Sequence, residues 1–119
     1  MKTEQIAKRL AELCNNGELE TAQKELFSND AISIEPQATP EFPRETKGLK
    51  AIIEKGHKFA SMTDKVYGIT TSEPLVTGNS FAMKLSMDMA MKGKKREKIE
   101  ELCVYNVKDD KIVSEQFFM

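Results

Sequence analysis

Few residues of this chain have side chains that could do acid–base, nucleophilic or metal chemistry. The 119 residues include one histidine, His57, and two cysteines, Cys14 and Cys103, which lie far apart in the sequence. These three residues cannot supply the four ligands of a Cys/His zinc site, and a nucleophilic triad with a histidine base would depend on His57 alone. We therefore expect no metal site.

The sequence also contains no recognisable motif for binding an organic cofactor. The six glycines are scattered one at a time, so no glycine-rich phosphate-binding loop is present. ATP, NAD and flavin are therefore poor candidates on their usual motifs, and we expect no cofactor. The two isolated cysteines are interpreted as buried thiols.

The composition indicates one globular domain, residues 1–119. Eighteen Lys and Arg residues nearly balance 19 Asp and Glu residues, and the pI of about 5.9 argues against a nucleic-acid-binding protein. No apolar run approaches the roughly 20 residues that a membrane-spanning helix needs, so we expect no membrane partner. The N-terminal residues lack the apolar stretch of a secretory signal, which predicts a cytoplasmic protein.

The first third of the chain has the apolar spacing of helices. Apolar residues recur at helical intervals after Thr3, a plausible N-cap, and again from Leu19 to Phe27. Residues 28–30, Ser-Asn-Asp, favour a turn after the second helix. Residues 31–35 alternate between apolar and polar types and predict a short strand.

A proline-rich loop precedes the third predicted helix. Residues 36–43 hold three of the four prolines, and long ordered loops often border a binding site. The helix is predicted from about Lys47 to Ala60. Phe59 lies on its apolar face, and His57 lies at the flank of that face.

From Thr63 onward the apolar period is that of strands. Alternation predicts four strands, at residues 66–77, 80–91, 96–108 and 111–119. Short turns between successive strands require an antiparallel meander. Three N-terminal helices followed by a meander predict an α+β fold, with the helices packed on one face of a curved, mostly antiparallel sheet.

The segment Glu101–Phe118, Glu-Leu-Cys-Val-Tyr-Asn-Val-Lys-Asp-Asp-Lys-Ile-Val-Ser-Glu-Gln-Phe-Phe, resembles the last hairpin of the nuclear transport factor 2-like superfamily, SnoaL-like group. In that hairpin an aromatic-x-Val strand turns through Asp-Gly-Lys-Ile, and Asp110 stands here in place of the glycine. The Gly48-Leu49-x-x-Ile52 start of the third helix is also similar. The resemblance implies a cone-shaped α+β barrel with a pocket at its open end. The superfamily includes isomerases, cyclases, dehydratases and proteins with no known reaction, so the fold does not fix the function.

The resemblance also implies which side chains face the pocket. The inward positions would be Met83, Leu85, Met87 and Met89, then Ile99, Glu101, Cys103, Tyr105 and Val107, then Glu115, Phe117 and Met119. Ligand contacts are expected from Met83, Leu85, Met87, Cys103, Tyr105 and Phe117, together with Phe59. A bulge would reverse a strand's inward set. Such a lining suits a medium-sized apolar ligand with one or two oxygens, the alternative being that the methionines fill the core.

Two glutamates facing an apolar interior would be costly unless they are hydrogen-bonded or protonated. Burial and mutual repulsion would raise the pKa of Glu101 or Glu115 toward neutrality, which suits a general acid or base. Similar enzymes use an inward carboxyl group, without a cofactor, to move a proton next to a carbonyl. Their acid aligns nearer Cys103 here. His57 could form a dyad with either glutamate, and the alternative places both glutamates at a solvated rim or in ion pairs.

Three functions remain open from the sequence. The first is a small-molecule binding protein, the second a cofactor-free isomerase, cyclase or dehydratase that uses a pocket carboxyl group, and the third a protein-interaction domain. Leu102, Val104 and Phe118 would lie uncovered on the outer sheet face, and the resemblance implies a homodimer there. The basic segment 92–98 is interpreted as a solvated hairpin tip.

Overall fold

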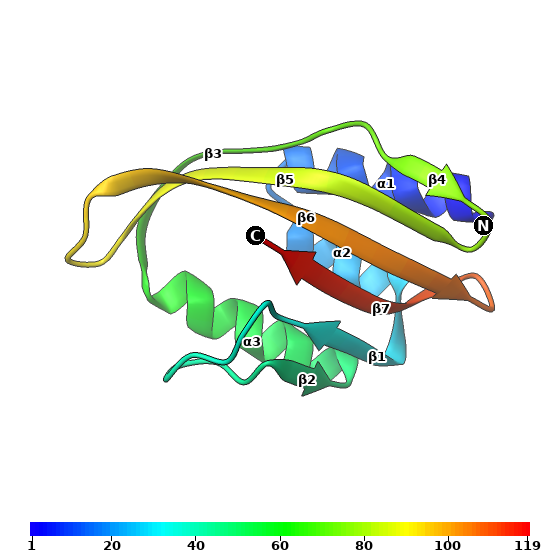
Figure 1. Cartoon of the computed structure of the whole chain (residues 1–119), viewed down its shortest axis with the longest axis horizontal. Coiled ribbons are helices and arrows are strands. Elements are labelled where there is room, and N and C mark those ends of the chain that lie inside the picture. The colour runs from blue at the N-terminus through cyan, green and yellow to red at the C-terminus, as the bar shows by residue number, and fades with distance from the viewer.

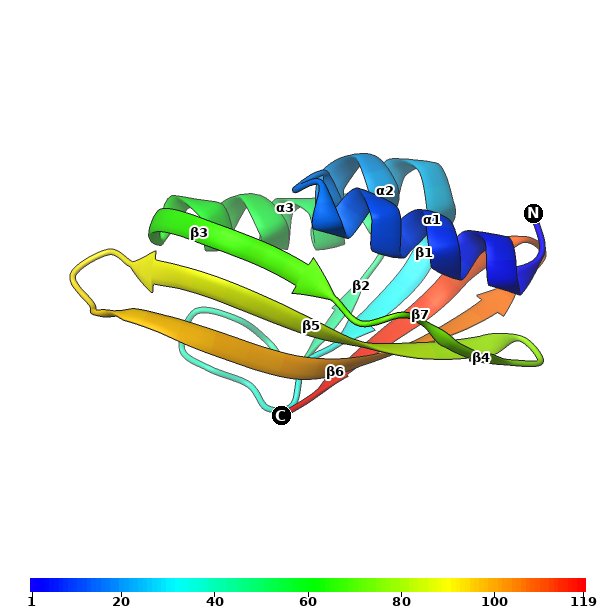
Figure 2. The same cartoon turned by 90° about the horizontal axis from the view of Figure 1, so that it is seen from above.

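The computed structural model describes all 119 residues and consists of three helices and seven strands (Figure 1). In chain order these are α1 (Thr3–Asn15), α2 (Leu19–Leu26), β1 (Phe27–Ile34), β2 (Glu45–Lys47), α3 (Leu49–Ser61), β3 (Thr63–Thr71), β4 (Leu75–Thr77), β5 (Ser80–Met91), β6 (Arg96–Lys108) and β7 (Lys111–Phe118). The helices lie on one face of a curved sheet (Figure 2). None of them combines the length and the apolar character needed to cross a membrane.

The strands form a single open sheet in the order β2-β1-β7-β6-β5-β3, and β4 also pairs with β5. All neighbours are antiparallel except β1 and β7, which run parallel. This parallel pair is needed because β1 precedes the meander in the chain but lies beside its last strand. The predicted α+β fold, with three helices on a curved and mostly antiparallel sheet, is confirmed.

The first helix is amphipathic and packs its apolar face on the sheet. Its buried residues recur at helical spacing and are Ile6, Ala7, Leu10, Leu13 and Cys14. They form one hydrophobic core with Leu26 of α2, Ile52 of α3 and the deep end of the sheet. Burial of this stripe positions α1 across the strands that carry the candidate site.

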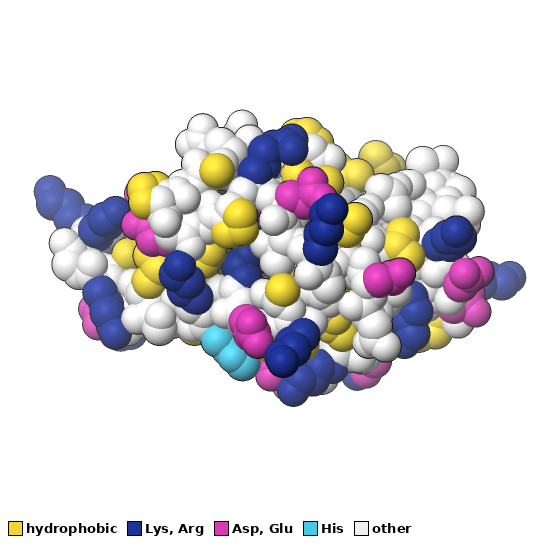
Figure 3. Space-filling view, turned by 90° about the horizontal axis from the view of Figure 1, so that it is seen from below, with side chains coloured by type: hydrophobic (Ala, Val, Ile, Leu, Met, Phe, Trp, Pro, Cys, Tyr) yellow, Lys and Arg dark blue, Asp and Glu magenta, His cyan; other side chains and the backbone are white.

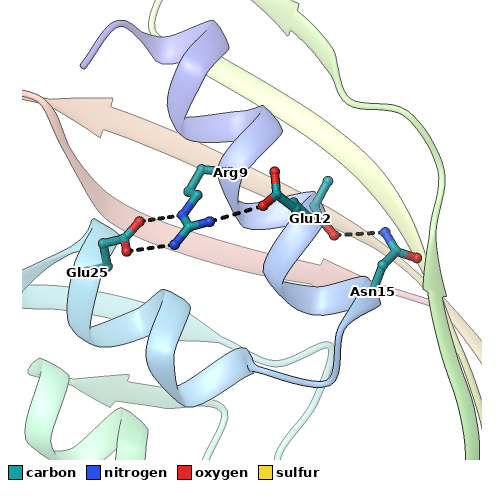
Figure 4. Close-up of polar contacts among 5 residues, drawn as sticks. Arg9, Glu12, Asn15 and Glu25 are labelled. Atoms are coloured by element: carbon teal, nitrogen blue, oxygen red, sulfur yellow. Dashed lines mark hydrogen bonds and ion pairs between the residues drawn. The ribbon is translucent and has the colours of Figure 1, made fainter.

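Polar contacts fix the orientation of α1 relative to its neighbours. Arg9 donates two hydrogen bonds to Glu25 of α2, of 2.8 and 3.1 Å, and a third of 3.1 Å to Glu12 (Figure 4). At the end of α1, the Asn15 amide donates to Thr71 Oγ1 at 2.7 Å and accepts from the Thr71 backbone N–H at 3.1 Å. The C-terminal end of α1 is therefore tied to the end of β3.

Three local predictions need correction. The single strand predicted over 66–77 is two strands, β3 and β4, because the regular pairing with β5 is interrupted between Thr71 and Leu75, where Pro74 has no N–H to donate. The turn predicted at residues 28–30 is instead part of β1, where the pairing with β7 shifts register between Phe27 and Ile32. The strand β2 was not predicted, since three residues are too few to show a period.

Candidate functional site

The strand registers arrange the inward side chains of the sheet in rows. The deep row is Thr46, Ser33, Glu115, Tyr105 and Phe81, taken from β2 to β5, and all five residues are buried. The second row is Phe117, Cys103 and Met83, the third is Glu101, Leu85 and Thr71, and the fourth is Ile99, Met87 and Ile69. These registers place both glutamates on the inner face of the sheet, two rows apart.

Burial decreases from the deep row to the fourth row. The side chains of Met83 and Cys103 are fully buried, whereas Leu85, Glu101 and Met87 are only partly buried. The reason is the length of α1, which ends at Asn15 beside Thr71 of the third row. The first two rows, apart from the partly buried Phe117, are therefore the packed core, and Phe117 with the third and fourth rows forms the accessible inner surface.

A chain of hydrogen bonds joins three elements at the deep row. Lys55 Nζ of α3 donates to Ser33 Oγ of β1 at 2.7 Å and to Glu35 Oε1 at 2.9 Å. Ser33 in turn donates to Glu115 Oε1 of β7 at 2.9 Å. The ammonium group also lies 5.8 Å from the centre of the Phe117 ring. An ammonium is thus connected to a buried carboxyl group through one hydroxyl group.

The Glu115 carboxyl group is almost completely buried, with 5% of the residue exposed. This burial raises the pKa of Glu115 to about 7, although the hydrogen bond from Ser33 and the charge of Lys55 both act to lower it. Glu115 is therefore poised to titrate near neutral pH. Its burial behind the second row also keeps it away from a ligand on the third and fourth rows.

The Glu101 carboxyl group differs from Glu115 in having no polar partner. It is partly buried in the third row and forms no side-chain hydrogen bond or salt bridge. Burial raises the pKa of Glu101 to about 7, the charge of Glu35 raises it further, and Lys55 opposes both effects. An accessible, unpartnered carboxyl group that titrates near pH 7 can accept or donate a proton.

The seven residues expected to contact a ligand divide into two groups. Met83, Cys103 and Tyr105 belong to the hydrophobic core, and the Tyr105 ring stacks on Phe81 with centroids 4.7 Å apart. The accessible group is Leu85, Met87, Phe117 and Phe59, each of which is partly buried.

Neither cysteine is poised as a nucleophile. Burial raises the pKa of Cys14 to about 12 and the pKa of Cys103 well above its ordinary value. Both thiols are free and buried, as the sequence predicted.

His57 does not form the expected dyad with Glu101 or Glu115. Its side chain is 64% exposed and contacts Glu20 of α2 on the outside of the molecule (Figure 3, cyan). Lys55 occupies the inner side of α3 instead. The signal was present in the sequence, because Lys55 lies three residues after Ile52 and four before Phe59, a cation within an apolar helix face.

Two open surface hollows lie away from the two carboxyl groups. One is beside the start of α1 and the β6–β7 turn, and includes Asp109 and Asp110. Another is on the outer side of α3 and includes His57. No group of three or more His, Cys, Asp or Glu side chains is arranged to hold a metal ion. The chemistry that this arrangement can do is proton transfer and hydrogen bonding by Glu101 beside Lys55.

The chain was compared with known proteins and structures. A model of the SnoaL-like domain matches residues 1–119. A Mesorhizobium loti protein, described provisionally as a SnoaL-like polyketide cyclase and as a carbohydrate phosphatase, is 28% identical over the whole of both chains, with a TM-score of 0.92. Comparison with curated proteins gives no match.

Two further solved structures share the fold at lower identity. A Xanthomonas campestris protein of unknown function with a cystatin-like fold is 20% identical, with a TM-score of 0.83, over 99% of this chain and 90% of its own. IdmH of Streptomyces antibioticus, described provisionally as a polyketide cyclase, is 18% identical, with a TM-score of 0.74, over 99% and 91%.

Replacing Glu115 by Gln should flatten the dependence of stability on pH. Below pH 4.5 the carboxyl group is protonated in the folded and unfolded chains alike, and between 4.5 and about 7 only the unfolded chain ionises. The wild-type free energy of unfolding should therefore fall as pH rises through this range, by roughly 2–3 kcal/mol from Glu115. Urea denaturation between pH 5 and 8 should show a smaller fall in Glu115→Gln.

The matched control is Glu100→Gln, on the outer face of β6. Hydrogen bonds from Lys84 and Ser86 lower the pKa of Glu100, so its contribution to stability is present above pH 4.5 and is lost only on further acidification. This variant should keep the wild-type slope between pH 5 and 8. An unchanged slope in Glu115→Gln would contradict the assignment of a buried, titrating Glu115.

Proposed function

The chain belongs to the SnoaL-like domain family, and from this premise we propose that it binds a medium-sized, largely apolar small molecule with one or two oxygen atoms. The ligand would lie against the third and fourth rows of the sheet and under the second half of α3. The observation that carries the proposal is the Glu101 carboxyl group, which is partly buried among apolar side chains without a polar partner.

An unpartnered carboxyl group in apolar surroundings is energetically costly, so its position favours a role in binding. Leu85 pairs directly with Glu101, and Met87, Phe117 and Phe59 add partly buried apolar surface. Methionine adapts its shape easily, which suits contact with a small molecule. A polar atom of the ligand at Glu101 would offset the cost of burying the carboxyl group.

Native mass spectrometry of the freshly purified protein should detect a retained small molecule. Met87→Arg places a long cation in the fourth row and should abolish retention, because a charged side chain would occupy the apolar binding surface. Thr70→Arg is the matched control, since Thr70 is exposed and pairs with Ser86 on the outer face, and it should retain the molecule. An empty protein that also fails to bind 2-methylnaphthalene in an NMR titration would sink the proposal.

A second candidate function is a cofactor-free isomerase, cyclase or dehydratase. The observation that favours it is Glu101, whose pKa is about 7, near the Lys55 ammonium group. Ionised Glu101 would take a proton from a carbon next to a ligand carbonyl. The C–H electron pair would form the C=C bond of an enolate, and the C=O π pair would move to the oxygen. Glu101 would then return the proton to the ligand. Solved structures similar to this chain are described as polyketide cyclases.

Exchange of the α-protons of 2-tetralone for deuterium in D2O tests this second function. The wild-type protein should accelerate exchange, with a rate that rises through about pH 7 as Glu101 ionises. Glu101→Gln should reduce the acceleration about a hundredfold or more, the usual size of a general-base contribution. Glu100→Gln on the outer face should leave it unchanged. Equal exchange rates with and without the protein would contradict the proposed proton transfer between Glu101 and 2-tetralone.

We also propose that a second copy of the chain covers the outer sheet face. Leu102 and Phe118 are paired across β6 and β7 and are each 46% exposed, with Val104 beside them. The nearest charges on this face are already paired within the chain, as Lys84 with Glu100 at 3.1 Å. A neutral apolar patch of this kind fits an identical patch on another copy better than it fits a charged partner.

Val104→Glu should convert this dimer into a monomer, because it places a charge in the centre of the apolar contact. Light scattering coupled to size-exclusion chromatography measures the mass, and circular dichroism checks that the variant is folded. Thr70→Arg, at the edge strand, should remain dimeric. A dimer that persists in Val104→Glu would move the contact to another face.

A further inference from the structure

Carboxyl groups outnumber ammonium groups on the inner face, and this imbalance indicates which polar group a ligand can carry. One ammonium group, Lys55, lies among three carboxyl groups, those of Glu35, Glu101 and Glu115. Glu35 forms a salt bridge with Lys55 at 2.9 Å, and Glu115 accepts a hydrogen bond from Ser33 at 2.9 Å. Glu101 is left without a hydrogen-bond donor or a cation in direct contact.

Lys55 is poorly placed to attract an anionic ligand. Two of its three N–H groups already donate, to Ser33 and to Glu35, and the Glu35 carboxylate balances its charge. Only 14% of its side chain is exposed. Drawing Lys55 toward a ligand carboxylate would break the hydrogen-bond chain to Glu115 and leave the buried Glu115 and the partly buried Glu35 with less compensation.

The surroundings of Glu101 provide acceptors and apolar atoms, and the one N–H group of Lys55 that is not already donating makes no hydrogen bond to Glu101. Glu35 follows β1, Glu115 lies on β7 and Cys103 lies on β6. Lys55 on α3 acts on Glu101 only through space. A carboxylate accepts hydrogen bonds at both oxygens, and such charge-assisted bonds are stronger than bonds between neutral groups.

We propose that the ligand presents a hydrogen-bond donor, a hydroxyl or a protonated amine, to Glu101, and that the site rejects ligands whose polar group is a carboxylate. The inference rests on the proposed binding function and narrows its ligand class. The feature that such ligands share is a hydrogen-bond donor, which an alcohol, a phenol or an amine can supply. A ligand carboxylate would instead meet Glu101 as a like charge.

Four naphthalene probes of nearly equal size test this proposal: 2-naphthalenemethanol, 2-naphthylmethylamine, 2-naphthoic acid and 2-methylnaphthalene. Their dissociation constants are measured by NMR titration of the full chain at pH 6 and pH 8. At pH 8 the alcohol or the amine should bind at least about tenfold more tightly than the acid, the effect expected of one hydrogen bond to a charged group.

The dependence on pH distinguishes the two kinds of donor. The amine should bind more tightly as pH rises from 6 to 8, because Glu101 ionises in this range while the amine stays charged. The alcohol should change less, since a protonated Glu101 can still accept its hydrogen bond. The acid should bind more weakly as pH rises, because it is ionised throughout and Glu101 gains charge.

Glu101→Gln should bring the dissociation constants of acid and amine to within about threefold of each other, since it removes the charge and keeps the shape. Glu100→Gln, next to it in sequence and on the outer face, should preserve the wild-type preference. This pair of variants assigns the preference to one carboxyl group and not to the net charge of the protein, because both remove one negative charge.

Each outcome bears on the proposal. An acid that binds as tightly as the alcohol and the amine at pH 8 overturns it, and so does a preference that survives Glu101→Gln. Equal binding of all four probes overturns the donor inference and leaves the proposed binding function standing. No binding by any probe, 2-methylnaphthalene included, overturns both.

Discussion

A single hydroxyl group, that of Ser33, receives a hydrogen bond from Lys55 and gives one to Glu115, and the inner site depends on it. The three residues come from α3, β1 and β7. A hydroxyl can act as donor and acceptor at once, so it can stand between an ammonium and a carboxyl group in a space where neither is solvated. The position of α3 over the sheet, and hence the depth of the accessible inner surface, follows from this contact together with the burial of Ile52.

The two inward glutamates have similar pKa values but different surroundings. Glu115 is enclosed by the core and accepts a hydrogen bond from Ser33, so it helps to hold β7 against β1. Glu101 lies two rows away, beyond the end of α1, where a small molecule can approach it. The length of one helix therefore decides which carboxyl group is structural and which is available for binding.

Much of the fold could be predicted from the sequence, because alternation over β5, β6 and β7 is long and regular. The strands predicted at 80–91 and 96–108 have the bounds that the structure gives them. The strand break at Pro74 and the bulge in β1 were not predicted, because each is a local departure from the alternating pattern of a strand.

The site was predicted less completely than the fold. Strand parity places Glu101 and Glu115 inward, but His57 was predicted to be the α3 residue near these glutamates, and the structure has Lys55 there instead. Which of two flanking helix positions faces the sheet depends on the rotation of α3, and that rotation is set by contacts with Ser33 and Glu35 that lie far away in the sequence.

The parallel pairing of β1 with β7 has a further consequence for how the protein is made. Ser33 and Glu115 are separated by 82 residues, and the parallel partner of β1 is the last strand of the sheet in chain order. The helices and β1 must therefore wait, with part of their apolar surface uncovered, until β7 has been synthesised.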